Sequence, residues 1–402
     1  MPRRAAVEEL AVFTGRPAFP EPLHVGTPNV GDQEVFLERT RDILERKRFT
    51  NDGSYVRELE RRVAELTDVE HCIATCNGTA ALQLVASATG LTGEVIVPSF
   101  TFVATAHAFQ WQGLTPVFCD IDEKTHNLDP SHAAELITDR TSAIVGVHVW
   151  GRPAYSDELF ELARNRGLQL LFDAAHALGC SSGQRPIGGR GEAEILSFHA
   201  TKIVNTFEGG AVLTNDGELA DRLRALRNFG FVDYDDVRGI GVNGKMSEIA
   251  AAMGLTTLES LDDFVSTNRR NYAQYRVELD AVPGLSVTPY DEAEQQNYQY
   301  VVVEIDTERC SVPRDDLMRI LHAENVLARR YFYPGCHRME PYRTLAPNLR
   351  LPVTEDVASR ILILPTGSTV ASEDVTTICQ ILSLAVNNPE ALLDHLSVAP
   401  RA

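Results

Sequence analysis

The sequence predicts an α/β protein with a large, mainly parallel sheet and a smaller C-terminal α/β domain. Up to about residue 216, short apolar runs alternate with segments whose apolar residues recur at helical spacing. This alternation is typical of βαβ units, which form a parallel sheet covered by helices on both faces. Beyond that point helices dominate, and 402 residues are enough for two domains. We expect an N-terminal arm and large domain over residues 1–265, and a small domain over 266–402.

The first half of the chain predicts its elements in a regular order. A Pro- and Gly-rich arm covers residues 1–30, Asp32 can cap the first helix, and TNDG at 50–53 marks a turn. The next helix carries Val56, Leu59 and Val63 on one face. Seven strands are expected, over 72–75, 94–98, 116–121, 142–149, 168–173, 194–199 and 210–215. The helices between them are expected over 32–45, 56–66, 78–88, 102–111, 131–137 and 156–166.

The second half predicts fewer strands. Helices are expected over 218–228 and 247–279, followed by a strand at 300–305, a helix at 315–324, a strand at 361–365 and a helix at 372–385. The segment NFGFVDYDDVR before Gly239 is polar and rich in turn residues, so no strand is expected there.

Composition narrows the class of protein. The formal net charge of −19 argues against a nucleic-acid partner, because phosphate backbones bind basic surfaces. No apolar run approaches the length of a membrane span, and the N-terminus lacks the apolar core of a secretory signal. Seven cysteines without a CxxC pair make a disulfide framework improbable. We therefore expect a cytoplasmic protein with no membrane contact. No motif with metal-ligand spacing is present.

Asp173 and Lys202 are the strongest candidates for chemistry. Each follows an apolar run, in FDAAHALG and SFHATKIVNTFEGG, so both are expected at strand ends where side chains meet in one pocket. A lysine between apolar strands tends to be buried and to lose its proton, which suits a nucleophile. Pyridoxal phosphate chemistry needs this pair, because a lysine binds the aldehyde and an acid protonates the pyridine nitrogen. The alternatives are a helix-capping Asp173 and a solvated Lys202.

Two glycine-containing segments could bind phosphate. CNGTAAL at 76–82 places a polar turn between a strand and a helix N-terminus, although an ordinary Asn-Gly turn fits as well. Gly239, Gly241 and Gly244 match G-x-G-x-x-G, which would suit a nicotinamide-dependent oxidoreductase, but the expected preceding strand is missing. The same segment nearly fits a P-loop, but Met246 stands where Ser or Thr is required. We reject both glycine motifs.

Taken in order, the motifs resemble those of the DegT/DnrJ-type sugar aminotransferases, which are pyridoxal phosphate enzymes of fold type I, the aspartate aminotransferase fold. The similarity extends from TPNVGD at 27–32 to LPTG at 364–367 and includes NGTAAL, PSFTFVAT, GVHVWGRP, FDAAHALG, SFHATK, EGGAVLT, GVNGKMSE and YFYPGCH. The resemblance implies a homodimer with shared active sites. Gly244 and Lys245 depart from the aromatic and Arg usual in the family.

The resemblance also implies roles for individual residues. Lys202 and Asp173 would be catalytic. Gly78, Thr79 and Ser197 would hold the phosphate. The remaining expected cofactor contacts are Phe102 on the ring, His176 near its phenolic oxygen and Asn243, which would reach the phosphate from the neighbouring subunit. His199, His337 and Lys245 are expected on the substrate side.

The implied reaction transfers an amine from L-glutamate to a nucleotide-linked 4-keto-6-deoxysugar. Two observations favour the C4 aminotransferases of antibiotic deoxysugar pathways. His199 stands where 3-ketosugar enzymes often carry Tyr, and the motifs GVHVWGRP and YFYPGCH are similar to those of the C4 enzymes. Those that act on dTDP-4-keto-6-deoxy-D-glucose are the most similar. A 3-ketosugar aminotransferase and a sugar dehydratase of the same family stay open as alternatives, but Lys202 argues against the dehydratases that carry His instead.

Overall fold

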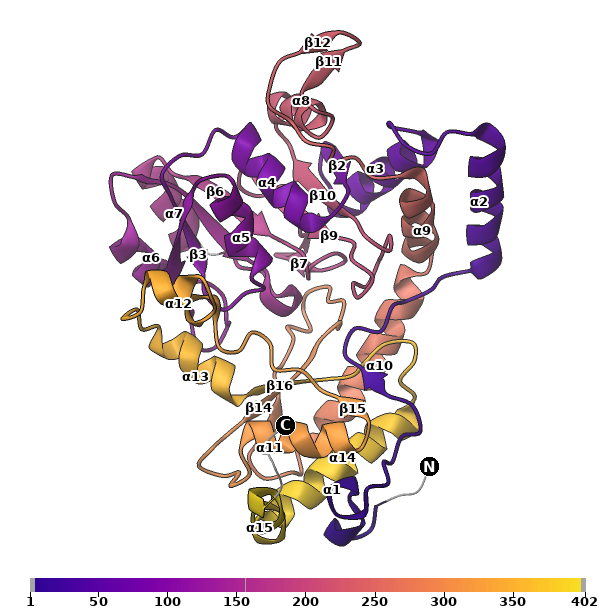
Figure 1. The fold of residues 1–402 in the computed structure, drawn as a ribbon, viewed down its shortest axis with the longest axis vertical. Helices are drawn as coiled ribbons and strands as arrows, with labels where there is room; N and C mark the ends of the chain where they lie inside the picture. The colour runs from indigo at the N-terminus through magenta and orange to yellow at the C-terminus, as the bar shows by residue number, and fades with distance from the viewer. Residues whose placement is uncertain (1–3, 156, 399–402) are drawn as a thin grey trace.

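A seven-stranded mixed sheet forms the centre of the large domain in the computed structural model, which describes residues 4–155 and 157–398 (Figure 1). Only β10 runs antiparallel to its neighbours, so the predicted mainly parallel seven-stranded sheet is confirmed. In spatial order the strands are β2 (His71–Thr75), β10 (Gly210–Thr214), β9 (Ala193–Ser197), β6 (Gln169–Asp173), β5 (Thr141–Val147), β3 (Glu94–Pro98) and β4 (Thr115–Cys119).

Helices cover both faces of this sheet because its strands are apolar on both sides. Side chains such as Val97 and Leu171 pack on one face, and Ile96 and Phe172 pack on the other. The first face is covered by α4 (Gly78–Ala88), α5 (Ala104–Trp111) and α8 (Gly217–Leu226). The second is covered by α3 (Ser54–Thr67), α9 (Glu248–Glu259), α6 (Pro130–Leu136) and α7 (Asp157–Arg166).

Several predicted helices differ at their ends. The helix expected over 156–166 is α7, and Ser156 itself lies outside the described residues. The helical stretch expected over 247–279 consists of two helices, because Ser260 has non-helical dihedrals between α9 and α10 (Leu261–Leu279). Asp32 caps α2 (Gln33–Arg46) as expected, accepting from the amides of Glu34 and Val35.

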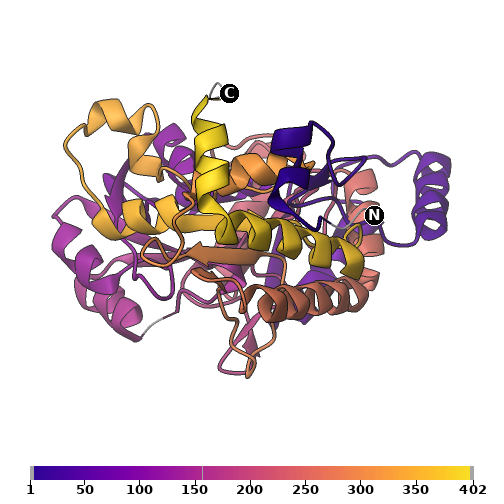
Figure 2. The same cartoon turned by 90° about the horizontal axis from the view of Figure 1, so that it is seen from below.

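The small domain has an antiparallel sheet of its own, in the order β13 (Leu285–Val287), β14 (Val301–Ile305) and β16 (Ile361–Leu364). It packs against α10, α11 (Arg314–Ala323), α14 (Ser372–Asn387) and α15 (Pro389–Val398). The N-terminal arm, with η1 (Val7–Glu9) and α1 (Ala11–Thr14), joins this core rather than that of the large domain (Figure 2). The expected boundary near residue 265 falls inside α10 and stays a prediction.

A segment of the second half returns to the large domain. Cys336, Tyr342 and Leu351 pack in the same core as α4 and α5. Asp120 accepts hydrogen bonds from the amides of Val353 and Thr354. The elements of this segment are η3 (Cys336–Arg338), α12 (Tyr342–Leu345) and α13 (Pro352–Arg360). The two domains are therefore joined by packed side chains as well as by the chain connection.

The remaining elements are short. They are the pairs β1 (Leu23–His24) with β15 (Val326–Leu327), β7 (Ser181–Ser182) with β8 (Arg185–Pro186) and β11 (Phe231–Asp233) with β12 (Asp236–Val237), and the 3-10 turn η2 (Val149–Gly151). The β11–β12 hairpin occupies the segment where no strand was expected. It projects from the large domain at the top of Figure 1, and α2 stands apart at the side in both views.

Candidate active site

The candidate site lies at the edge of the large sheet where β6 and β9 end. Asp173 is the last residue of β6 and Ser197 the last of β9, and these two strands are parallel neighbours. β2 ends at the same edge, and its chain then turns through Asn77 into α4. The parallel strands therefore bring together residues that are far apart in sequence.

Asp173 is buried and held by two donors. Thr105 Oγ1 donates to its Oδ2 at 2.8 Å, and the amide of Ala175 donates to its Oδ1 at 3.1 Å. Both oxygens thus accept hydrogen bonds, as a carboxylate requires. Thr105 was not predicted as a site residue, although it lies within the PSFTFVAT motif.

Lys202 is half-buried, and its Nζ lies 3.4 Å from the hydroxyl of Tyr300. Burial lowers the pKa of the Lys202 amine to about 8, against the opposing attraction of the nearby Asp173 carboxylate. A substantial fraction of the amine is therefore neutral and nucleophilic just above neutral pH. Tyr300 comes from the small domain, and nothing in the sequence signalled that it faces Lys202.

His176 lies beside the same lysine. Its ring centroid is 4.4 Å from that of Tyr300, and its Nδ1 accepts a hydrogen bond from the amide of Trp150 at 3.4 Å. Burial and the Lys202 charge hold the pKa of His176 well below its usual value, so the imidazole is neutral. Lys202, Asp173, His176 and Tyr300 form one cluster.

The turn before α4 offers free backbone donors. Asn77 Oδ1 accepts from the amide of Ala80 at 2.8 Å, which leaves the amides of Gly78 and Thr79 with no acceptor among the described residues. A Cβ atom on Gly78 would lie 3.3 Å from Ser197 Cβ, so the Ser197 hydroxyl is next to this turn. Two free amides at a helix N-terminus beside a hydroxyl suit a phosphate group.

Phe102 and His199 are accessible from solvent. Phe102 is 62% exposed just before α5, the helix that carries Thr105. His199 is exposed, with Nδ1 at 2.9 Å from Thr201 Oγ1 and Nε2 at 3.6 Å from Glu208 Oε1. Both side chains are therefore open to contact with a ligand from solvent.

Asn243 and Lys245 lie near the turn but not in the Lys202 cluster. The amide of Cys76 donates to the carbonyl of Gly244 at 2.7 Å, and Asn243 is exposed. Lys245 Nζ donates to Asn228 Oδ1 at 2.7 Å. Lys245 lines a separate cavity of about 210 Å³, together with Asn51, Asp52, Val56, Arg224, Arg227, Asn228 and Met246.

His337 does not fit its expected role as a substrate contact. The ring is buried, with Nδ1 2.7 Å from Ser99 Oγ and Nε2 3.0 Å from Glu355 Oε1. With both nitrogens occupied, the imidazole has no donor or acceptor left for a substrate. In this arrangement His337 anchors the loop between β15 and α12 to the large domain.

The rejected glycine segment has a structural explanation. A Cβ atom on Gly241 would lie 2.4 Å from the Leu226 carbonyl oxygen and 2.4 Å from the Gly230 amide nitrogen. The glycine is needed for close backbone packing at the base of the β11–β12 hairpin.

No group of three or more residues suited to a metal occurs in the described part of the chain, and no helix there is long and apolar enough to cross a membrane.

Residues 31–383 match the DegT/DnrJ/EryC1/StrS aminotransferase family. The chain belongs to this family. It is therefore an aminotransferase, with the α/β architecture of the family's solved structures. The crystal structure of DesI in the presence of its TDP-sugar product is 51% identical with a TM-score of 0.94, and covers 98% of this chain and 100% of that one.

Curated relatives extend the comparison. The chain is 36% identical to the dTDP-4-amino-4,6-dideoxy-D-glucose transaminase of Shigella dysenteriae, over 88% of this chain and 96% of that protein. It is 32% identical to the GDP-perosamine synthase of Escherichia coli O157:H7, over 85% of this chain and 93% of that enzyme. These two relatives are thus named for sugars on different nucleotides, dTDP and GDP.

The Thr105–Asp173 bond predicts a loss of activity in Thr105→Val. The valine preserves the shape but removes the donor to a buried carboxylate, so we expect kcat to fall about tenfold. The measurement is transamination per cofactor-loaded site. Thr105→Ser, which keeps the hydroxyl, should recover most of the activity, and equal kcat values for Val and Ser variants would contradict the role of this bond.

Proposed function

We propose that this aminotransferase uses pyridoxal phosphate and L-glutamate to convert a nucleotide-linked 4-keto-6-deoxysugar into the 4-amino sugar. The observation that carries the proposal is the cluster of Lys202, Asp173 and His176 beside the free amides of Gly78 and Thr79. The most specific substrate we propose is dTDP-4-keto-6-deoxy-D-glucose.

The described residues fit the cofactor in four respects. The amides of Gly78 and Thr79 with the Ser197 hydroxyl would hold its phosphate. Asp173 would hold the proton of the pyridine nitrogen, Phe102 would cover the ring, and His176 would lie near the phenolic oxygen. When bound, pyridoxal phosphate supplies an electron sink for the pair left at the carbon that loses its proton.

The residues of the chain then have separate tasks. Lys202, with its lowered pKa, accepts the proton from Cα of L-glutamate as a general base and later returns a proton to C4 of the sugar as a general acid. Thr105 and the Ala175 amide fix the Asp173 carboxylate so that it need not reorient as charge develops. His176 is neutral and therefore adds no positive charge beside Lys202.

The sugar assignment is supported by relatives. Proteins 36% and 35% identical to this chain are dTDP-4-amino-4,6-dideoxy-D-glucose transaminases, and DesI was crystallised with its TDP-sugar product. The exposed His199 supports a C4 substrate because several enzymes acting at C4 carry His where 3-ketosugar enzymes often carry Tyr. A 3-ketosugar aminotransferase or a sugar dehydratase is the alternative.

A homodimer is also part of the proposal. A group of exposed apolar side chains lies on and around the β11–β12 hairpin, with Tyr234 91% and Ile240 97% exposed. An exposed patch of this kind is typical of a protein interface. The others are Phe229, Phe231, Val232, Val237 and Val242. Asn243 follows directly, so an interface here would bring it to the neighbouring subunit.

All seven cysteines are free thiols, which supports a cytoplasmic location.

Capture of the cofactor should depend on Lys202 and on pH. Because the pKa of the amine is lowered to about 8, the neutral form gains with rising pH through that value. The rate of pyridoxal phosphate uptake by cofactor-free protein, followed by absorbance, should rise and level off above about pH 8. Borohydride should label wild-type protein at Lys202. A Lys202→Ala variant that transaminates at a comparable rate would refute the assignment.

A substrate panel tests the sugar. Purified protein with L-glutamate should form 2-oxoglutarate in the presence of dTDP-4-keto-6-deoxy-D-glucose, and the matched UDP and GDP sugars measure the preference for the nucleotide. Turnover restricted to a 3-ketosugar would overturn the C4 assignment but leave the assignment as an aminotransferase intact. Loss of a sugar hydroxyl without consumption of glutamate would instead identify a dehydratase.

Mixed subunits test whether Asn243 acts across the dimer. Lys202→Ala and Asn243→Ala chains should each be impaired alone. A heterodimer would contain one site with an intact Lys202 and an intact Asn243 from the other chain. We therefore expect about half of the sites to be active in the isolated heterodimer, and about a quarter of all sites in an equal mixture that pairs at random. If Asn243 served its own subunit, mixing would restore nothing.

A further inference from the structure

Trp150 lies behind the candidate active site. It is completely buried, and it has a left-handed backbone with φ of 62° in η2, the turn that follows β5. A bulky residue seldom adopts this conformation, and such strain persists where the surroundings fix it for a purpose. The amide of Trp150 donates to His176, and its carbonyl accepts from the Tyr290 hydroxyl at 3.2 Å. The position of this residue is thus tightly defined.

The indole packs on the neighbours of Lys202. It stacks on His176 with 6.2 Å between centroids and 21° between planes, and it makes an edge-to-face contact with Tyr300, with 5.4 Å between centroids and 62° between planes. It also packs on Phe332, parallel within 9° at 5.4 Å, on Phe100 at 5.9 Å and on Tyr331 at 6.4 Å. Tyr300 and His176 are the side chains that surround the Lys202 amine together with Asp173. Rotation of the indole would therefore displace them.

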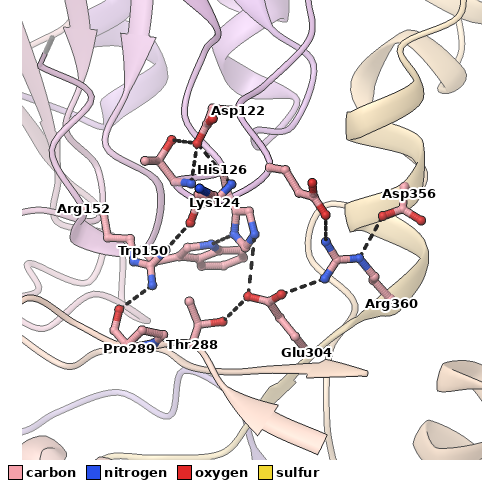
Figure 3. A network of polar contacts seen from close by, with 12 residues as sticks. Asp122, Lys124, His126, Trp150, Arg152, Thr288, Pro289, Glu304, Asp356 and Arg360 are labelled. Carbon is pink, nitrogen blue, oxygen red and sulfur yellow. Dashed lines mark hydrogen bonds and ion pairs between the residues drawn. The ribbon is translucent and has the colours of Figure 1, made fainter. Parts of the chain in front are cut away.

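A single hydrogen bond fixes that rotation. The indole N–H of Trp150 donates to His126 Nδ1 at 3.2 Å (Figure 3). Since Nδ1 accepts, the neutral ring carries its proton on Nε2. Burial lowers the pKa of His126 to about 4, so the ring is neutral near pH 7. His126 is fully buried and also has a left-handed backbone, with φ of 61°.

A carboxylate of the small domain faces His126 from the opposite side, without a hydrogen bond to the ring. Its Nε2 faces Glu304 Oε1 at 3.8 Å, and Glu304 accepts from Thr288 at 2.8 Å and from Arg360 at 2.7 Å. Arg152, close to Trp150 in sequence, donates to the carbonyls of Lys124 and Pro289. Figure 3 shows that Glu304 on β14 lies between His126 and Arg360 on α13.

We propose that Trp150 is a positioning residue of the active site and that neutral His126 sets the orientation of its indole. Trp150 holds His176 and Tyr300 in place beside Lys202 without touching a substrate. The Glu304–Arg360 pair extends this arrangement to the small domain. The inference rests on the proposed function for its kinetic consequence, but the hydrogen bond itself is measurable without turnover.

The bond is tested by indole nuclear magnetic resonance. Trp111, exposed on α5, is the only other tryptophan, so Trp111→Phe leaves Trp150 as the sole indole. With ¹⁵N-labelled indole in cofactor-free protein, one N–H cross-peak reports the contact. In His126→Phe we expect this peak to move upfield and its proton to exchange faster with water. His126→Gln, which keeps an acceptor, should retain slow exchange. An unchanged peak in His126→Phe would refute the bond.

Kinetics test the positioning role. In the same background, His126→Phe and Trp150→Phe should each lower kcat per cofactor-loaded site about tenfold, while KM for L-glutamate stays within about twofold. The kcat of the double variant should be no lower than that of Trp150→Phe, because both changes remove the same hydrogen bond. His126→Gln should recover kcat.

Two results would overturn the positioning role. One is a lower melting temperature with unchanged kcat per loaded site, and the other is additive losses in the double variant. If His126→Phe does not fold, Trp150→Phe alone decides, and an unchanged kcat refutes the role. Absence of transamination by the parent Trp111→Phe protein and by wild type would instead count against the proposed function, and the indole measurement would still stand.

Discussion

The partial burial of the Lys202 amine beside Asp173 is the interaction on which the site depends. Desolvation lowers the pKa of the amine and the nearby carboxylate opposes that shift, so the pKa of about 8 is a balance between the two. A more exposed lysine would stay protonated at neutral pH, and an isolated buried one would be costly to keep charged. The surrounding architecture maintains this balance, because Thr105 fixes the carboxylate and Tyr300 closes the space around Nζ.

The two domains build the site jointly. The large sheet supplies Asp173 and Ser197 from the ends of parallel neighbouring strands, which is where such sheets place ligands. The small domain supplies Tyr300, and the loop with His337 is anchored back to the large domain through Ser99. Because the N-terminal arm and the segment around Cys336 each pack in the core of the other domain, the relative position of the domains is fixed by buried apolar contacts.

Polar groups from distant parts of the chain complete local structures. The helix α3 has Gly53 before it and no side-chain cap of its own, and Glu248 accepts from the amides of Tyr55 and Val56 instead. In the same way, the Glu324 carboxylate accepts hydrogen bonds from the amides of Ala11 and Ala18 and so holds the N-terminal arm. These carboxylates are the kind of feature that a reading of local patterns misses, because cap and helix are separated by well over a hundred residues.

The sequence by itself determined the seven-stranded sheet, the end of β6 that carries Asp173 and the turn at Gly78, since these depend on hydrophobic period and on residues adjacent in the chain. Lys202, which was expected at a strand end, lies instead in the loop between β9 and β10. Other features could not be found in this way. The partners Thr105 and Tyr300, the burial of His337 and the bond from Trp150 to His126 all require contacts between elements remote in sequence. Desolvation likewise depends on everything packed around a group, so only the tertiary structure decided the pKa of Lys202 and the neutrality of His176 and His126.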